Sequence, residues 1–453
     1  MSLSRRKFFT LAGASAAGTM LASPLEGLLA RKANGQPIFG GGYGSLVPDP
    51  KGLLDLPAGF QYVTFSRTGE LMSDGTLVPG AHDGMAAFPG PRNTVILVRN
   101  HELGTGFDGS RTQGPKPYDP IAKGGTTTLV VGANRQLIKD FVSLSGTIRN
   151  CAGGLTPWGS WISCEENVSV PDATNGLLKR HGFNFEVPAN ATSPVDPIPL
   201  VAMGRFNHEA VAVDPKTGIV YQTEDSGSSL FYRFIPKVAG KLQEGGVLQA
   251  LRITSRPEVD TSNARGNLFK FNVGEKFSVD WVTIEEPNPA ADTVRVEGRT
   301  KGAARFVRGE GIWYTEKNGK SEFYFVATTG GPDLNDPNGL GRGNGGGQVW
   351  RYIPADETVE LFVESTSRVE LDMPDNIVVS PYGDLILCED GGGENYLRGV
   401  TPQGKLYNFA RNALNDSEFC GACFSPDGKT LFVNIQSPGI TLAIWGPWTS
   451  KRA

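Results

Sequence analysis

The chain of 453 residues has little charge, few cysteines and histidines, and no long apolar segment after its first thirty residues. Only 20% of the residues are charged, and 43 basic against 47 acidic residues leave a formal net charge of −4. Because the chain has no basic cluster beyond the N-terminus, we expect no nucleic-acid partner. No later segment approaches the length of a transmembrane helix, so we also expect no stable membrane span.

Glycine and proline, by contrast, are abundant. The 59 glycines and 31 prolines are about 20% of the chain, against roughly 12% in average proteins. The absence of a G-X-Y period excludes collagen, and a content of 39% hydrophobic residues argues against disorder. Helix breakers at this density leave few windows for long helices. The composition therefore predicts a large, turn-rich, all-β globule.

The first thirty residues have the pattern of an export signal. Arg5 and Arg6 precede an uncharged, mildly apolar stretch over residues 11–22. A twin arginine before such a stretch is typical of a bacterial Tat signal, although a short membrane anchor is the alternative. We expect residues 1–33 to be the signal and its flanking segment, recognised by the Tat translocase, and residues 34–453 to be one domain. The protein is then periplasmic or extracellular.

One unit of turn, strand and acidic end recurs along the chain. Turns rich in Pro, Asp and Gly at residues 214–218, 380–384 and 425–429 lead into short β-branched or aromatic strands. Looser copies are centred near residues 97, 161 and 325. Repeats of roughly 40 to 60 residues are the mark of a β-propeller. The spacing predicts six blades, or seven if a blade is hidden around Trp281–Glu285. A pair of β-sandwiches is the alternative.

In a propeller, polar residues at equivalent ends of the innermost strands meet at the axis. Acidic residues end several of the repeated strands, namely Glu102, Glu165, Glu166, Glu224, Asp225, Glu389 and Asp390. Together they would repel one another unless cations compensate. Oxygen ligands favour Ca²⁺ or Mg²⁺, and an added thiolate or imidazole admits a transition metal. The repeat thus predicts an axial metal site, while each residue alone also fits a solvated strand end.

Histidine and cysteine add further candidates. His101 and His208 lie in the same tripeptide, Asn-His-Glu, and either ligate a metal or hold a carboxylate ligand in place. Five cysteines are an odd number for an exported protein, so at least one is outside an internal disulfide. Cys420 and Cys423 form a lone C-G-A-C, which predicts two buried thiols or a local disulfide rather than a zinc ribbon.

Four motifs occur in order along the chain. They are R-N-C-A-G-G-L-T-P-W-G at 149–159 with C-E-E at 164–166, G-R-F-N-H-E at 204–209, F-V-R-G-E-G at 306–311, and P-D-N at 374–376 with C-E-D at 388–390. In this order they resemble the PhoX-type alkaline phosphatases, an exported, Tat-dependent bacterial family. The resemblance covers about residues 99–436. It implies a six-bladed propeller whose axial pocket holds a mixed iron–calcium cluster and hydrolyses phosphate monoesters.

The same resemblance implies roles for individual residues. Cys151 matches the iron-ligating cysteine, which accounts for the odd thiol, and Arg308 matches a phosphate-contacting arginine. Glu209 and Glu310 match the glutamates that bridge iron and calcium, and Asp375 and Glu389 match further acidic ligands. Cys164 and Cys388 lie in mid-strand and are expected to be buried thiols.

The chemistry of phosphate monoesters agrees with these roles. Several cations can neutralise the dianion, stabilise the leaving alkoxide and activate an oxygen nucleophile. The planar fork of Arg308 matches phosphate oxygens, although a salt bridge with Glu310 would also explain this residue. Asn100, Asn207 and Asn376 are expected to donate to phosphate or to ligate metal. No serine nucleophile of the kind found in other alkaline phosphatases is evident.

The sequence thus predicts a monomeric, exported phosphoric monoester hydrolase with Fe³⁺ and Ca²⁺. The expected metal ligands are Cys151, Glu209, Glu310, Glu102, Glu165, Glu166, Asp375, Glu389 and Asp390, and the expected substrate contacts are Arg308, Asn100 and Asn207. Two other functions fit an axial calcium site. One is a calcium-dependent propeller hydrolase of lactones or phosphotriesters, which iron at Cys151 would exclude. The other is a non-catalytic binding propeller, which hydrolysis of any phosphate ester would exclude.

Overall fold

The computed structural model describes residues 42–334 and 345–449. Within these ranges the chain consists of β-strands joined by turns and loops, with one α-helix, α3 (Val294–Thr300). The all-β prediction is confirmed. None of the described helices is long and apolar enough to cross a membrane. The twin-arginine segment and the predicted domain start at residue 34 lie outside the described residues.

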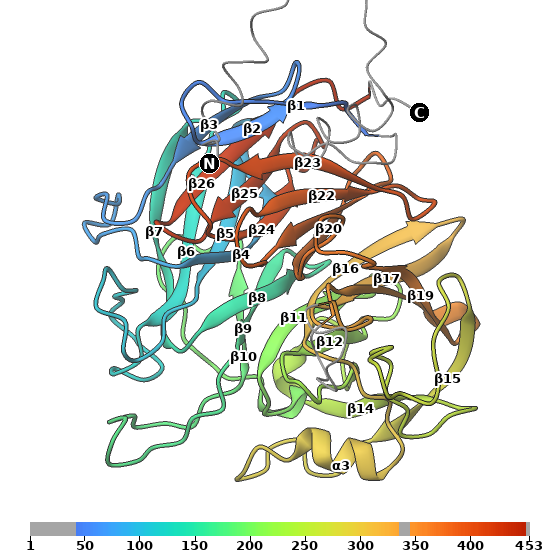
Figure 1. Cartoon of the computed structure of the whole chain (residues 1–453). Helices are drawn as coiled ribbons and strands as arrows, with labels where there is room; N and C mark the ends of the chain where they lie inside the picture. The colour runs from blue at the N-terminus through green and yellow to red at the C-terminus, as the bar shows by residue number, and fades with distance from the viewer. Residues whose placement is uncertain (1–41, 335–344, 450–453) are drawn as a thin grey trace, which may run out of the picture.

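Six strands form a ring around a central axis. These axial strands are β4 (His82–Pro89), β8 (Asn150–Leu155), β11 (His208–Val213), β16 (Gly309–Lys317), β20 (Pro374–Val379) and β24 (Phe419–Phe424). Each contacts the next in chain order, and β24 contacts β4 to close the ring. From each axial strand further antiparallel strands follow outward (Figure 1). The fold is therefore an all-β, propeller-like ring.

A second strand pairs with each axial strand in antiparallel fashion. The second strands are β5 (Val95–His101), β9 (Ser160–Glu165), β12 (Val220–Glu224), β17 (Lys320–Ala327), β21 (Leu385–Glu389) and β25 (Leu431–Ile435). Further strands complete the sheets, namely β1 (Leu46–Val47), β2 (Leu54–Pro57), β3 (Gln61–Phe65), β6 (Gly124–Val131), β7 (Leu137–Thr147), β10 (Asn184–Pro188), β13 (Tyr232–Pro236), β14 (Gly246–Ile253), β15 (Lys276–Thr283), β18 (Gln348–Ile353), β19 (Thr358–Glu364), β22 (Tyr396–Val400), β23 (Leu406–Asn412) and β26 (Ile440–Trp445).

The number of sheets corrects the prediction of six or seven separate blades. The described strands form five hydrogen-bonded sheets, because β15 pairs with β14 on one side and with β19 on the other. β15 thereby joins the strands that follow β11 and β16 into one nine-stranded sheet. Trp281, which marked a hidden seventh blade in the sequence, belongs to this connecting strand.

The first and last strands of the described residues pair with each other in two of the sheets. β3 pairs with β26 and β2 pairs with β23, so blue N-terminal strands lie beside red C-terminal strands in Figure 1. The Tyr43 hydroxyl donates to the carbonyl of Trp448 at 3.0 Å, and the Phe60 ring packs edge-on against both aromatic rings. This pairing between early and late strands holds the ring closed and covers sheet edges that would otherwise be free.

Every axial strand carries a β-bulge near its start. The register against the second strand shifts, for example, between His82 and Met85 and between Asn150 and Gly153. The other four axial strands show the same shift within their first five residues. Because a bulge adds an unpaired residue and re-aims the side chains around it, six copies can turn equivalent side chains toward one place.

Candidate metal centre

The centre is built from equivalent positions of the axial strands. The second residues of these strands are Asp83, Cys151, Glu209, Glu310, Asp375 and Cys420, and all six are buried. Cys420 is engaged elsewhere, because its Sγ donates to the carbonyl of His82 at 2.8 Å. The other five belong to groups whose possible ligand atoms lie within 4.8 Å of one another.

Residues that directly follow the second strands add more carboxylates. Glu102 follows β5, Glu166 follows β9, and Asp390 follows β21. Four groups result: Asp83, Glu102 and Cys151; Cys151, Glu166 and Glu209; Glu209, Glu310 and Asp375; and Asp375, Asp390 and Glu418. Because consecutive groups share a member, they form one continuous set of ligand atoms, which we call the donor set.

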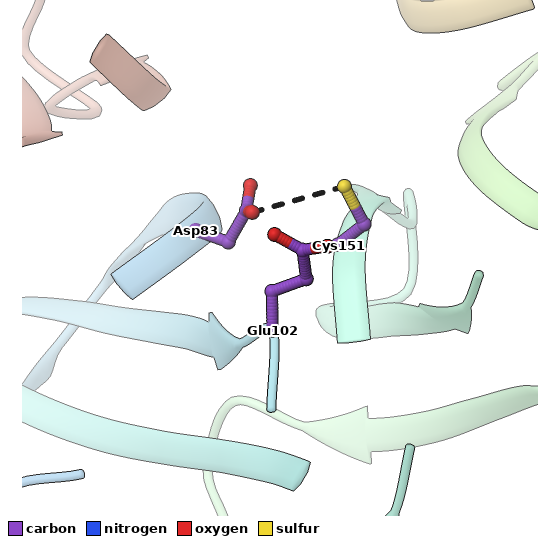
Figure 2. A group of neighbouring side chains, drawn as sticks. All are labelled: Asp83, Glu102 and Cys151. Atoms are coloured by element: carbon purple, nitrogen blue, oxygen red, sulfur yellow. Dashed lines mark hydrogen bonds between the residues drawn. The ribbon is translucent and has the colours of Figure 1, made fainter. Parts of the chain in front are cut away.

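Cys151 places a sulfur atom among oxygen atoms. Figure 2 shows Asp83, Glu102 and Cys151, each from a different strand or strand end, with their polar atoms turned toward one another. The Sγ of Cys151 lies 3.7 Å from Oδ2 of Asp83. Burial, followed by the charges of Asp83 and Glu209, raises the pKa of the Cys151 thiol well above its usual range. A bound metal ion reverses this effect, because it favours the thiolate.

The carboxylate of Glu209 indicates that the donor set fits a cation. Its side chain is fully buried, and neither carboxylate oxygen has a hydrogen-bond partner among the described residues. Burial, followed by the charges of Glu310 and Asp375, raises the pKa of Glu209 well above its usual value. An unpaired buried carboxylate is costly, and a cation that accepts both oxygens as ligands removes the cost.

Other members of the donor set show the same excess of negative charge. Burial, and then the charge of Asp390, raises the pKa of Asp375 to about 7. Burial also raises the pKa of Asp390 to about 6 and that of Glu166 to about 9, although arginines oppose both shifts. Crowded carboxylates of this kind are typical of sites for hard cations.

Arg308 lies at the edge of the donor set, two residues before Glu310. Its Nε and Nη2 donate to Asp225 at 3.0 and 3.1 Å, and Nη2 also donates to Glu310 at 2.5 Å. The salt bridge between Arg308 and Glu310, which the sequence analysis gave as the alternative role of Arg308, is therefore present. The Arg308 side chain is nevertheless 28% exposed, so the guanidinium can also reach a ligand.

The structure does not bring Glu165 into the donor set, which corrects its prediction as a metal ligand. Glu165 ends β9, and its side chain points away from that of Glu166 because side chains alternate along a strand. Its carboxylate contacts Nδ1 of His181 at 2.6 Å and accepts from the backbone N–H groups of Ile148 and Gly182. Glu165 therefore holds neighbouring loops together.

Glu389 needs the same correction. It ends β21 and lies outside the four groups, whereas the next residue, Asp390, lies within them. Oε1 of Glu389 accepts from Nε of Arg398 at 2.6 Å and from the backbone N–H of Asp372 at 2.8 Å. Glu224, at the end of β12, is likewise bonded to the Tyr232 hydroxyl. In each acidic pair, the first residue supports the sheet.

Asn100 does not face the donor set either. Its amide nitrogen donates to the carbonyl oxygens of Cys151 and Ala152 at 3.1 and 2.7 Å. Its amide oxygen accepts from the Trp161 indole and the Ser163 hydroxyl at 2.9 and 2.8 Å. These four bonds occupy the side chain, so Asn100 fixes the backbone that presents Cys151 instead of contacting a substrate.

Neither histidine of the repeated tripeptide reaches the donor set. The His101 ring bonds the carbonyl of Gly80 and the hydroxyl of Thr127, and the His208 ring bonds the carbonyl of Gly204. Burial lowers the pKa of His101 well below its usual value and that of His208 to about 3. Both rings are neutral backbone supports.

The two remaining asparagines lie beside the donor set. Asn207 donates to the carbonyl of Asp225 at 3.3 Å. Asn376 donates to Oδ1 of its neighbour Asp375 at 2.8 Å, and its own amide oxygen accepts from the backbone N–H of Gly421. Asn376 thus orients a carboxylate of the set.

The motifs do not single out Asp83, Arg149 or Glu418 as members of this site. Arg149 donates from Nε and Nη2 to Glu102 and from Nη2 to Glu166 at 2.7 Å. A positional signal was available, since Arg149 precedes Cys151 by two residues just as Arg308 precedes Glu310. Glu418 likewise precedes Cys420 by two residues, whereas Asp83 has no such signal, because it follows none of the clear turn-strand repeats.

Comparisons with known proteins agree with this architecture. The family model for alkaline phosphatase PhoX matches residues 41–439. The structure is similar to Pseudomonas fluorescens PhoX in complex with vanadate, a transition state analogue, with a TM-score of 0.65 and 19% identity over 90% of this chain and 98% of that chain. A weaker likeness is to virginiamycin B lyase from Staphylococcus aureus, with a TM-score of 0.41 and 11% identity over 85% of this chain and 99% of that chain. No curated protein matches the chain.

The family match includes the whole ring and every member of the donor set. The similarity to the Pseudomonas structure supports the propeller-like fold. The family match confirms the predicted resemblance and the predicted enzyme class, a phosphoric monoester hydrolase. The chain belongs to the alkaline phosphatase PhoX family.

Proposed function

We propose that the chain is an exported, metal-dependent alkaline phosphatase that releases inorganic phosphate from small-molecule phosphate monoesters. Family membership supports the reaction. The observation that carries the metal dependence is the buried Glu209 carboxylate, whose two oxygens have no partner among the described residues. The twin arginine at Arg5 and Arg6 supports export by the Tat pathway to the periplasm or beyond.

The chemistry of the donor set supports two kinds of cation. The proposed iron ligands are Cys151, Glu209 and Glu310, because a thiolate among carboxylates suits Fe³⁺. Calcium would be held by the remaining carboxylates Asp83, Glu102, Glu166, Asp375, Asp390 and Glu418. When bound, these cations supply the Lewis acidity that neutralises the phosphate dianion and activates an oxygen nucleophile.

The protein's own groups bind and orient the substrate. Asp225 and Glu310 fix the guanidinium of Arg308 from one side and leave Nη1 without a hydrogen-bond partner among the described residues. The preorganised Nη1 can donate to phosphate oxygens without a conformational change. Asn376 holds the carboxylate of Asp375, and Asn100 holds the backbone at Cys151, so both act as positioning residues.

Two calcium-only functions, a lactone or phosphotriester hydrolase and a binding propeller, are less well supported. Neither makes use of a thiol inside the donor set, and the family match favours phosphate monoesters.

The test is elemental analysis of the purified exported protein beside a p-nitrophenyl phosphate assay. We expect iron and calcium in the active protein, and loss of iron and activity in Cys151→Ser. Cys164→Ser, another buried thiol outside the four groups, is the control and keeps both. Calcium alone with an inert assay would overturn the proposal.

A further inference from the structure

A ring of equivalent residues lies one step outside the donor set. Each of these rim residues stands two positions before the second residue of an axial strand, and they are Ala81, Arg149, Asn207, Arg308, Met373 and Glu418. The carbonyl oxygen of every rim residue accepts from the backbone N–H of the residue that follows the second strand. In the same order, the donors are Glu102, Glu166, Asp225, Thr328, Asp390 and Gln436. This repeated hydrogen bond places the six rim residues equivalently around the axis.

Two rim residues, Arg149 and Arg308, are bonded in the same manner. Both use Nε and Nη2 for carboxylates of the site, and the described residues provide no partner for either Nη1. Both Nη1 atoms face solvent, because neither is buried and the two side chains are 42% and 28% exposed. The backbone φ angles are +46° and +54°, but the rim residues Ala81 and Met373 have the same left-handed conformation, so it belongs to the rim backbone and not to the arginines alone.

A short chain of carboxylates connects the two arginines. Arg149 donates to Glu166 and Arg308 donates to Glu310. Glu166 and Glu310 each have a ligand atom within 4.8 Å of one of Glu209. Both guanidinium groups therefore border the same part of the donor set.

The rim is also asymmetric. The hydrogen-bond donors Arg149, Asn207 and Arg308 precede three consecutive axial strands, β8, β11 and β16. The rim residues on the other three strands are Ala81, Met373 and Glu418, which bring no positive charge. An anion at the donor set therefore meets both cationic side chains on one side of the ring.

We propose that Arg149 is a second phosphate-binding residue, whose Nη1 donates to the phosphoryl group of the substrate together with Arg308. The inference rests on the proposed function, because it names the group that the two arginines hold. Two guanidinium groups match the charge of a phosphate dianion, and each Nη1 can form charge-assisted hydrogen bonds with it. The competing role is purely structural, in which Arg149 only neutralises Glu102 and Glu166.

Arg149→Lys separates the two roles because its ammonium group keeps the charge that neutralises Glu102 and Glu166 but provides no Nη1 donor for phosphate. The measurement is the inhibition constant of inorganic phosphate against p-nitrophenyl phosphate hydrolysis, with elemental analysis of the same samples. We expect wild-type metal content and phosphate binding weakened by about tenfold or more. Arg149→Gln should weaken binding further. The matched control is Arg252→Lys, since Arg252 also bonds a carboxylate, that of Asp280, through Nε and Nη2 but lies outside the rim.

Wild-type phosphate affinity in a fully metallated Arg149→Lys protein would overturn the inference. Loss of metal from both variants would also overturn it, because Arg149 would then serve the donor set alone. If the wild type hydrolysed no phosphate ester, the proposed function would fail, and calorimetric titration with inorganic phosphate would still decide the role of Arg149. Binding to the wild type that weakens in Arg149→Lys supports the anion site, and equal or absent binding contradicts it.

Discussion

Glu165 and Glu166 are neighbours in the chain, yet their carboxylates serve different parts of the molecule. Glu165 contacts the His181 ring at 2.6 Å, whereas Glu166 accepts from Arg149 at 2.7 Å and lies beside Cys151. The strand end separates them, since side chains on opposite faces of a strand cannot reach the same site. The second residue of the pair therefore belongs to the donor set, and the first belongs to the scaffold.

This relationship predicts different losses for two matched variants. We expect Glu166→Gln to lower metal content and phosphatase activity, because it removes a carboxylate from the donor set. Glu165→Gln should lower the free energy of unfolding by about 1–3 kcal/mol, because buried donors lose a charged acceptor, while the folded fraction keeps its metal. Elemental analysis and urea unfolding of both variants check this. Equal metal loss in the two proteins would contradict it.

The pair between His181 and Glu165 predicts a pH dependence of stability. Burial lowers the pKa of His181, but the charges of Glu165 and Asp119 outweigh burial and raise it overall. A folded-state pKa above the unfolded value of about 6.5 stabilises the protein below that pH, and the effect is lost as the pH rises through the folded pKa. His181→Gln should therefore cost more unfolding free energy at acidic than at alkaline pH.

His208→Gln is the control for this experiment. Burial lowers the pKa of His208 to about 3 in the folded protein. The unfolded chain therefore binds a proton at His208 more tightly, and the protein loses stability as the pH falls below the unfolded-state pKa of about 6.5. His208→Gln should therefore lower the free energy of unfolding less at acidic than at alkaline pH, which is the opposite trend. A cost of His181→Gln that does not change with pH would refute the assignment.

Metal removal should make the stability of the protein depend on pH in a defined direction. Burial and neighbouring charges raise the pKa of Asp375 to about 7 and that of Asp390 to about 6. The metal-free folded protein then binds protons more tightly than the unfolded chain, so its stability rises as the pH falls from about 8 toward about 5. Melting temperatures with chelator should show this rise. The loaded protein should not show it, because cations hold the carboxylates ionised. Identical profiles would count against a metal site.

The close approach of axial strands predicts that one glycine is essential. A Cβ at Gly311 would lie 2.6 Å from the carbonyl oxygen of Asp375 and 2.8 Å from the backbone nitrogen of Ile377. Gly311→Ala should destabilise the protein by about 1–3 kcal/mol and lower its metal content, because the strand carrying Asp375 must move. Gly106→Ala, at a position with nothing within 4 Å, is the control. Equal unfolding midpoints for the two variants would show that the ring tolerates expansion.

Much of this architecture could be predicted from the sequence, because turns, alternating strands and acidic ends are local patterns. The resemblance also identified Cys151, Glu209 and Glu310, which lie together in the structure. The sequence could not decide which member of each acidic pair faces the axis, since that depends on the residue at which the strand ends. Nor could it place Asp83 and Glu418, because register shifts at the bulges and closure by distant strands determine their positions.

The most direct measurement compares metal content and p-nitrophenyl phosphate hydrolysis in wild type, Glu209→Gln and Glu389→Gln. Both glutamates are fully buried, but only Glu209 belongs to the donor set. We predict metal and activity in the wild type, loss of both in Glu209→Gln, and retention of both in folded Glu389→Gln. A Glu209→Gln protein that keeps its metal and its activity, or a wild type that is fully active without metal, would contradict the account.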